Sequence, residues 1–344
     1  MKSLPKFIID FLEHLEVERN RSQKTIENYS FYLRRFLEWF GDKNPSDINS
    51  EEIRKYRLWL NRLIDAHGDP LKKNTQNYHL IALRSFLKYL AKRDVKTLSP
   101  EKIELMKMPD RDISFLEGSD LNAILEAPLK HISATTLQHH NTTTPQHRNT
   151  TTNKPIDSPS LIAFRDKALL ELLFSTGLRV SELINLKKED VNLKKDEFTV
   201  IGKGRKARVV FLSEQAKYWV KKYLELRKDF NPCLFVSHDK RSGNKKEIKK
   251  YGNKEIIDQP LTARSVQRAV QKYARAAGIT KSVTPHTLRH SYATDLLQNG
   301  ADIRSVQAML GHSSITTTQI YTHITDKELW NVHKRFHGKE RGND

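Results

Sequence analysis

The stretch Thr284-Pro285-His286-Thr287-Leu288-Arg289-His290 has the features of a helix start that presents two polar side chains together. Threonine is a good N-cap, and proline suits the first helical position because the N–H that it lacks needs no partner there. His286 and Arg289 are then one turn apart on the same face, near a helix terminus that favours anions. This arrangement of an imidazole and a guanidinium predicts a phosphate site.

Zinc binding is the alternative interpretation of this stretch, because His286 and His290 have the i,i+4 spacing of one metalloprotease motif. That motif needs a glutamate after its first histidine, and Thr287 stands there instead. We therefore expect no metal, and His290 fits better as a packed, hydrogen-bonded structural histidine.

Three further stretches carry groups that suit phosphate chemistry. Ser175-Thr176-Gly177-Leu178-Arg179 separates two predicted helices and ends in an arginine. Gly202-Lys203-Gly204-Arg205-Lys206 is a basic turn between two predicted strands; it lacks the residue order of a nucleotide-binding P-loop, but a lysine at such a tip can reach a groove of DNA. Leu310-Gly311-His312-Ser313-Ser314 adds a histidine, and Tyr321 follows soon after.

Together with Thr317-Thr318-Gln319-Ile320-Tyr321-Thr322-His323, these stretches resemble the motifs of the tyrosine recombinases, and among them the Xer-like chromosome recombinases. The order of the motifs and the intervals between them are similar to those of the family. The amino-terminal stretch Ser22-Gln23-Lys24-Thr25-Ile26-Glu27-Asn28-Tyr29 is similar to the family's core-binding domain. Two departures, at 131–157 and 239–258, lie outside the motifs.

The resemblance implies a site-specific DNA recombinase that works through a 3′-phosphotyrosyl intermediate and a Holliday junction. The resemblance implies that such an enzyme needs no cofactor and no metal. It also needs no ATP, because the covalent link conserves the energy of the phosphodiester. The catalytic residues that match the family's motifs are Arg179, Lys203, His286, Arg289, His312 and Tyr321.

The chemistry of these side chains fits the roles that the resemblance implies. Tyr321 would be the nucleophile, and its weakly acidic phenol makes His286 the expected base. Arg179 and Arg289 would bind the phosphate oxygens through their forked donors, and the second histidine of the set would add a hydrogen bond. Lys203 would protonate the leaving 5′-oxygen.

The charge of the chain also predicts a nucleic-acid partner. Its 60 Lys and Arg residues against 41 Asp and Glu residues give a formal net charge of +19, most of it after residue 110. Such an excess indicates a polyanionic partner, with a solvated basic face as the plainer alternative. The residues expected to contact DNA are Lys24, Lys73, Asn74, Gln76, Arg205, Lys206, Arg264 and Arg268.

The expected partner is double-stranded DNA with paired half-sites, bound by a homo-oligomer that forms a tetramer on two duplexes. A second recombinase or a DNA translocase is a further expected partner. Chromosome-dimer resolution, a step of chromosome partition at cell division, is the role that the resemblance favours. The alternatives are an integrase or excisionase of a mobile element, a type IB topoisomerase-like relaxing enzyme, and a non-catalytic DNA-binding protein. The intact set of catalytic positions counts against the last.

Composition excludes several other classes of protein. No apolar run reaches the roughly 18–20 residues that span a bilayer, and acidic residues interrupt the amino end where a signal peptide would be apolar. Cys233 is the sole cysteine, which excludes disulfides and cysteine-based metal sites within one chain. We expect a cytoplasmic, nucleoid-associated protein.

The predicted fold class is mainly α, with two domains. Residues 1–104 are expected to form a helical-bundle, SAM-like core-binding domain, with Ser22 as an N-cap and Gly41 as a helix stop. Residues 105–114 are the expected linker. Residues 115–344 are expected to form a mixed α/β, mostly helical catalytic domain with a small antiparallel sheet from 198–201 and 208–212.

Two stretches of this second domain are expected to lie apart from its core. Residues 131–157 are rich in Thr, His and Asn, and predict a disordered insertion. Residues 326–344 predict an amphipathic tail helix, which docks either on a neighbouring protomer or on its own domain.

Overall fold

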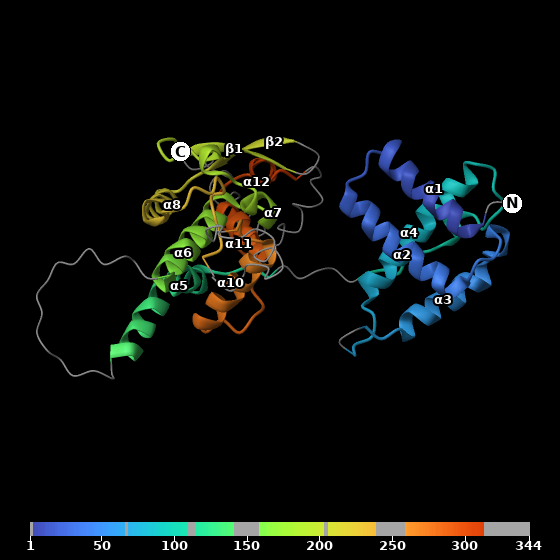
Figure 1. Cartoon of the computed structure of the whole chain (residues 1–344), viewed down its shortest axis with the longest axis horizontal. Helices are drawn as coiled ribbons and strands as arrows, with labels where there is room; N and C mark the ends of the chain where they lie inside the picture. Colours follow the sequence, from blue (N-terminus) through green and yellow to red (C-terminus); the bar gives the residue numbers. More distant parts are fainter. Residues whose placement is uncertain are drawn as a thin grey trace, which may run out of the picture. The chain divides into compact units, whose positions relative to one another are not determined.

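The computed structural model describes residues 3–65, 68–108, 114–140, 158–202, 206–238 and 259–312, with the backbone alone at 131–140 and 158–159. The chain divides into two compact units, Met1–Arg111 and Asp112–Asp344, and this division falls within the stretch predicted as a linker (Figure 1). Within the described parts of the chain, no helix is both long enough and apolar enough to span a membrane.

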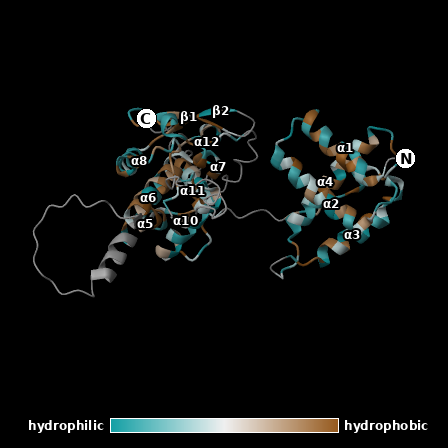
Figure 2. Ribbon diagram, in the orientation of Figure 1, coloured by the Kyte–Doolittle hydropathy of each residue, from teal (hydrophilic) through white to brown (hydrophobic). Residues whose placement is uncertain are grey.

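The first unit is a helical bundle whose apolar side chains face inward. Figure 2 shows hydrophobic and hydrophilic stretches alternating along each helix, as expected when one face packs against a core. Two 3₁₀ turns, at Pro45–Asp47 and Pro100–Lys102, complete the unit. Its helices are α1 (Leu4–Val17), α2 (Gln23–Phe40), α3 (Ser50–Arg62) and α4 (Lys73–Ala91).

Local sequence signals set the helix ends of this unit. The hydroxyl of Ser22 accepts a hydrogen bond from the backbone N–H of Thr25, which confirms the predicted N-cap of α2. Gly41 ends the same helix with φ of 82°, a conformation that favours glycine. The side chain of Asn49 accepts from the N–H groups of Glu51 and Glu52 at the start of α3.

The second unit is built around α6, which packs against α5, α8 and α11. Four of its leucines, Leu169, Leu170, Leu172 and Leu173, are fully buried, and a helix covered on several sides shows little amphipathic patterning. Strands β1 and β2 form an antiparallel pair in which Val200 lies opposite Arg208. The elements are α5 (Gly118–His140), α6 (Ser158–Thr176), α7 (Val180–Ile184), a 3₁₀ turn (Lys188–Asp190), β1 (Glu197–Ile201), β2 (Ala207–Phe211), α8 (Glu214–Leu226), α10 (Ala263–Ala276), α11 (Pro285–Gln298) and α12 (Ile303–Leu310).

These elements confirm the predicted fold class, a mainly helical protein with a small antiparallel sheet. One prediction needs correction, because α5 continues to His140 and residues 131–140 are helical rather than part of a disordered insertion. No glycine or proline follows Leu129 within this helix, so nothing in the local sequence stops it. The remaining 141–157, the 239–258 loop and the 326–344 tail lie outside the described residues.

A buried polar network ties α6 to α10. Asp166 accepts hydrogen bonds from the hydroxyl of Tyr273 at 2.9 Å and from Nε of Arg165 at 2.8 Å. Arg165 also donates to the carbonyl oxygen of Val236 at 3.1 Å. Burial raises the pKa of Tyr273, with the negative charge of Asp166 acting in the same direction, so its hydroxyl remains protonated and acts as a donor.

We predict that Tyr273→Phe lowers the free energy of unfolding of the second unit by about 1–2 kcal/mol, because the buried carboxylate of Asp166 loses a donor. Urea unfolding followed by circular dichroism measures the change. Tyr218→Phe is the matched control, since this tyrosine is 54% exposed. Equal stability of the two variants would show that the hydrogen bond contributes nothing.

Candidate active site

The centre of the site is Arg289, a residue that is only 4% exposed. It lies on α11, which begins at Pro285 after the predicted Thr284 cap. The two Nη atoms of Arg289 donate to the carbonyl oxygens of Gly177 and Leu310, at the carboxyl ends of α6 and α12. These helix ends carry partial negative charge, so they orient the arginine and satisfy it electrostatically.

Two glycines make this arrangement possible. Gly177 has φ of 58° and Gly311 has φ of 64°, so both use the left-handed conformation that favours glycine. A Cβ atom at Gly177 would lie 2.5 Å from the ring of Tyr292, and one at Gly311 would lie 2.8 Å from Cδ of Arg208. The glycines in the Thr-Gly-Leu-Arg and Leu-Gly-His stretches are therefore required by close approach as well as by backbone conformation.

The second phosphate-binding candidate, Arg179, is held by Glu182 on the short helix α7. Its backbone N–H and its Nη1 each donate to a carboxylate oxygen of Glu182 at 2.9 Å. Its Nη2 reaches the carbonyl oxygen of Gly311 at 3.3 Å. The side chain is 27% exposed, so Arg179 can meet a ligand from solvent.

Glu182 also binds Arg208, and sequence analysis assigned a role to neither of them. Nη1 and Nη2 of Arg208 donate to the two carboxylate oxygens at 3.0 and 2.8 Å, while Nε donates to the carbonyl oxygen of Met309 at 3.0 Å. Burial opposes ionisation of Glu182, but the hydrogen bonds from Arg208 and Arg179 outweigh it and lower the pKa to about 2. The sequence does contain a signal for Glu182, because an acidic residue at the third position of a helix is typical of side chains that bond back to the start of that helix.

Three histidines surround these arginines. Partial burial and the positive charges of Arg289 and Arg179 lower the pKa of His286. Burial and neighbouring cationic groups lower the pKa of His290 to about 4, and they do the same for His312. All three rings are therefore uncharged at neutral pH, and each can accept a proton or donate one hydrogen bond.

The structure brings together Arg179, His286, Arg289 and His312, four of the six predicted catalytic residues. Lys203 and Tyr321 lie outside the described residues. Gly202, which ends the described part of this hairpin after β1, lies beside the site, because a Cβ atom there would lie 3.4 Å from side-chain atoms of both Arg208 and Glu182. Among the residues with described positions, no group of His, Cys, Asp or Glu is arranged to hold a metal ion.

The residues predicted to contact DNA differ in exposure. Gln76 is 5% exposed, and its amide nitrogen donates to the carbonyl oxygen of Leu71 and to the side-chain oxygen of Asn61. Gln76 therefore supports the loop before α4 and is no longer among the residues expected to contact DNA. No local pattern in the sequence shows that this side of α4 faces inward. Arg205 lies outside the described residues, and Asn74 is half-buried. The exposed members are Lys24, Lys73, Lys206, Arg264 and Arg268.

Comparison with known proteins agrees with this geometry. The model of the Phage integrase family matches residues 148–328, and that of the family's N-terminal SAM-like domain matches residues 8–94. The chain belongs to the phage integrase family. Two relatives are each called Tyrosine recombinase XerD. The one from Chlorobaculum tepidum is 35% identical over 96% of both chains, and the one from Lacticaseibacillus casei is 32% identical over 96% of this chain and 98% of its own.

Two solved structures share the fold of this chain. The XerH site-specific recombinase, in a post-cleavage complex with a palindromic difH substrate, has a TM-score of 0.63 and 21% identity over 91% of this chain and 80% of its own. The Tn1549 transposon integrase, in complex with transposon right end DNA, has a TM-score of 0.66 and 17% identity over 97% of this chain and 99% of its own. The family membership confirms the predicted tyrosine recombinase, an enzyme of DNA strand exchange.

We predict that Glu182→Gln lowers the free energy of unfolding by about 3 kcal/mol, because two arginines lose a shared buried anion. The folded-state pKa lies below the ordinary value, so this contribution is present above about pH 4.5 and is lost as the pH falls toward 2. Urea unfolding at pH 7 measures the loss. Glu225→Gln, in an exposed pair with Lys221 on α8, is the control. A similar, small loss in both variants would contradict the prediction.

A second prediction concerns His290 and His312, whose folded-state pKa of about 4 lies below the unfolded value of about 6.5. Between these values the unfolded chain binds more protons, so stability is complete above pH 6.5 and falls as the pH drops. The melting temperature should therefore decrease from pH 7 to pH 5. The decrease should be smaller when both residues are changed to Asn, whereas parallel curves over this range would exclude the effect.

Proposed function

We propose that this tyrosine recombinase is a Xer-type site-specific recombinase that resolves chromosome dimers at the nucleoid. The observation that carries the proposal is the gathering of two fixed guanidinium groups and two uncharged imidazoles where α6, α7, α11 and α12 meet. Relatives named XerD, at 35% and 32% identity over nearly the whole chain, support the Xer role.

The arginines would bind the non-bridging oxygens of the scissile phosphate. Arg289 is already oriented by the carbonyl oxygens of Gly177 and Leu310, and Arg179 by Glu182. Groups held in place before the substrate arrives need little reorganisation as charge develops on a pentacoordinate phosphorus. Forked donors also match a phosphate better than a lysine ammonium does.

Proton transfer would connect Tyr321, His286 and Lys203. The phenol oxygen of Tyr321 attacks phosphorus, the bond to the 5′-oxygen breaks, and a 3′-phosphotyrosyl link forms. His286 accepts the phenol proton, for which its lowered pKa keeps the ring uncharged at neutral pH. Lys203 donates a proton to the leaving 5′-oxygen, and His312 donates a hydrogen bond to the phosphate.

Strand exchange would follow from the reverse reaction, in which the 5′-hydroxyl of another duplex attacks the phosphotyrosyl link. Four copies on two duplexes with paired half-sites would exchange strands in two steps through a Holliday junction, with a second recombinase or a DNA translocase as a further partner. The XerH and Tn1549 integrase structures are complexes with DNA, which supports DNA as the substrate. The proposed contacts outside the catalytic set are Lys24, Lys73, Asn74, Arg205, Lys206, Arg264 and Arg268.

The test is Tyr321→Phe, which should abolish covalent attachment to DNA while leaving DNA affinity unchanged within about threefold, because phosphate contacts supply the affinity. DNA that stays bound to the denatured wild-type protein is sequenced to map the site, and a nicked duplex with that site then traps the intermediate on a denaturing gel. Tyr218→Phe, an exposed tyrosine on α8, is the control and should form the adduct normally. An adduct with Tyr321→Phe would refute the assignment of the nucleophile.

A further inference from the structure

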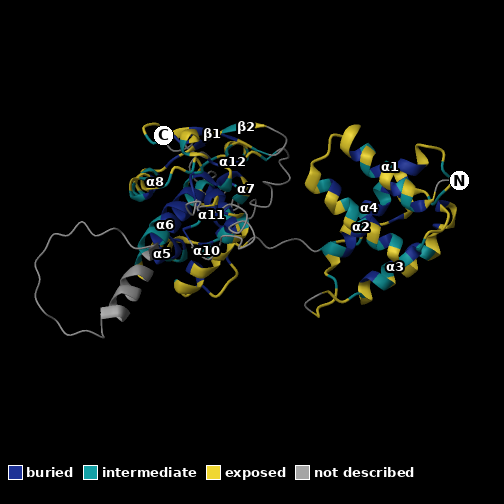
Figure 3. Cartoon of the chain, viewed as in Figure 1, coloured by how far each residue is buried: buried dark blue, intermediate teal, exposed yellow. Residues whose placement is uncertain are grey.

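Arg208 occupies a position on β2 where the strand pattern would place a core side chain. Exposed residues alternate with less exposed ones along this strand (Figure 3), so Arg208 lies on the same face as Val210. Val210 is 2% exposed, and the side chain of Arg208 is 9% exposed. A charged side chain takes such an inward position only when it is paired, so the partners of Arg208 indicate what it does.

The contacts of Arg208 join three parts of the candidate active site. Its Nη1 and Nη2 atoms bind the two carboxylate oxygens of Glu182, and its Nε donates to the carbonyl oxygen of Met309 at the end of α12. A Cβ atom at Gly311 would lie 2.8 Å from Cδ of Arg208, and one at Gly202 would lie 3.4 Å from its Nη1. Arg208 therefore contacts α7, the end of α12 and the hairpin at the same time.

Arg208 and Arg179 share the carboxylate group of Glu182. Oε1 accepts from the Nη1 atoms of both arginines, whereas Oε2 accepts from Nη2 of Arg208 and from the backbone N–H of Arg179. The guanidinium group of Arg208 thus binds both oxygens, while that of Arg179 binds only one. The side chain of Arg179 is 27% exposed against 9% for Arg208, so Arg179 is the arginine that can meet a ligand.

The charge balance of these three residues favours an anionic ligand. Burial opposes ionisation of Glu182, but its hydrogen bonds with the arginines lower the pKa to about 2, so the group is ionised at neutral pH. Two guanidinium groups and one carboxylate then leave one positive charge in excess. Without Arg208, Glu182 would neutralise Arg179, and both carboxylate oxygens would be free to bind the fork of Arg179.

We propose that Arg208 is a positioning residue for strand cleavage, which holds Glu182 so that Arg179 keeps its charge and its outward donors for the scissile phosphate. Through Met309, the same side chain fixes the turn that leads to His312. Arg208 acts without touching the DNA, because its Nε, Nη1 and Nη2 atoms are directed at protein acceptors. This proposal rests on the proposed role of Arg179 at the phosphate.

The test compares strand cleavage in two duplexes that carry the mapped site. One has the ordinary scissile phosphodiester. In the other, a methyl group replaces one non-bridging oxygen, and this neutral methylphosphonate is attacked more readily than the anionic diester. Arg208→Met should cleave the ordinary duplex about a hundredfold more slowly than wild type, because a displaced cation stabilises the transition state poorly. Its DNA affinity should stay within about threefold of wild type, because Arg208 makes no phosphate contact.

The neutral duplex distinguishes a positioning role from a merely structural one. It carries one negative charge fewer for Arg179 to neutralise, so the rates of Arg208→Met and wild type should differ there by no more than about threefold. Arg208→Lys keeps the charge but lacks the fork, and it should lose about tenfold on the ordinary duplex alone. This second variant tests the proposal even if Arg208→Met does not fold.

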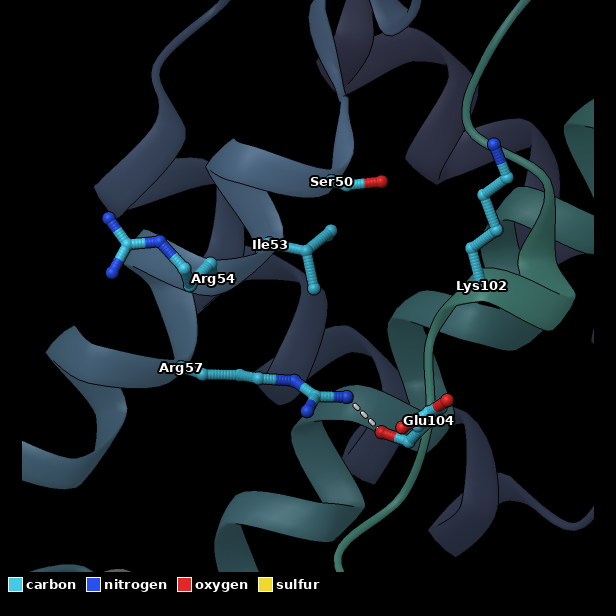
Figure 4. Close-up of a pocket in the computed structure, with 6 residues that line it drawn as sticks. All are labelled: Ser50, Ile53, Arg54, Arg57, Lys102 and Glu104. Carbon is cyan, nitrogen blue, oxygen red and sulfur yellow. Dashed lines mark hydrogen bonds between the residues drawn. The ribbon is translucent and has the colours of Figure 1, made fainter.

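Arg57→Met is the matched control, because Arg57 also binds a backbone carbonyl group but belongs to the first unit. Its Nη2 donates to the carbonyl oxygen of Glu104, beside a cavity of about 150 Å³ (Figure 4). This variant should cleave both duplexes at rates within about threefold of wild type. An equal loss in Arg57→Met and Arg208→Met would overturn the proposal.

Three further outcomes are decisive. An equal loss on the two duplexes in both Arg208 variants would give Arg208 a structural role only and overturn the proposal. Cleavage of the ordinary duplex by Arg208→Met within about threefold of wild type would also overturn it, while the proposed function would stand. Wild-type protein that cleaves neither duplex would refute the proposed function and this proposal with it.

Discussion

The candidate active site depends on the hydrogen bonds from Arg289 to the carbonyl oxygens of Gly177 and Leu310. They join α11 to the carboxyl ends of α6 and α12, segments far apart in the sequence. Each helix end supplies an acceptor that its own helix cannot satisfy, and the arginine satisfies both. The same bonds that close the packing of three helices also aim a cation at the place where a phosphate would bind.

Glu182 performs a related task for the other cations. An anion inside the proposed phosphate site lowers its net positive charge, but it also holds Arg179 and Arg208 at a fixed separation. A buried ion pair of this kind adds little stability compared with apolar packing, so its value lies in positioning. Partial burial, together with the positive charges of the neighbouring arginines, lowers the pKa of His286 and of His312 and keeps both rings uncharged at neutral pH, which leaves them available for proton transfer and hydrogen bonding.

The cations of the chain divide according to burial. Arg289 is buried and the side chain of Arg208 is 9% exposed; both use their donors on protein acceptors and hold helix ends together. Lys24, Arg264 and Arg268 are exposed and suit contacts with a polyanion. Net charge alone therefore indicates a nucleic-acid partner without identifying which cations meet it.

The sequence by itself determined where several helices begin and which family's chemistry to expect. Ser22, Thr284 and Pro285 act within one helical turn, and helix caps depend on neighbours in the chain, so these bounds were predictable. The motifs shared with the tyrosine recombinases likewise pointed to Arg179 and Arg289 as candidate phosphate-binding residues.

Only the tertiary structure decided which polar side chains face inward and what they meet. Gln76 carries the same local signals as an exposed residue, yet its side of α4 is covered. The role of Arg208 depends on Met309, 101 residues away, and on Glu182 across the hairpin. Such pairings arise when distant segments pack together, and no local pattern along the chain encodes them.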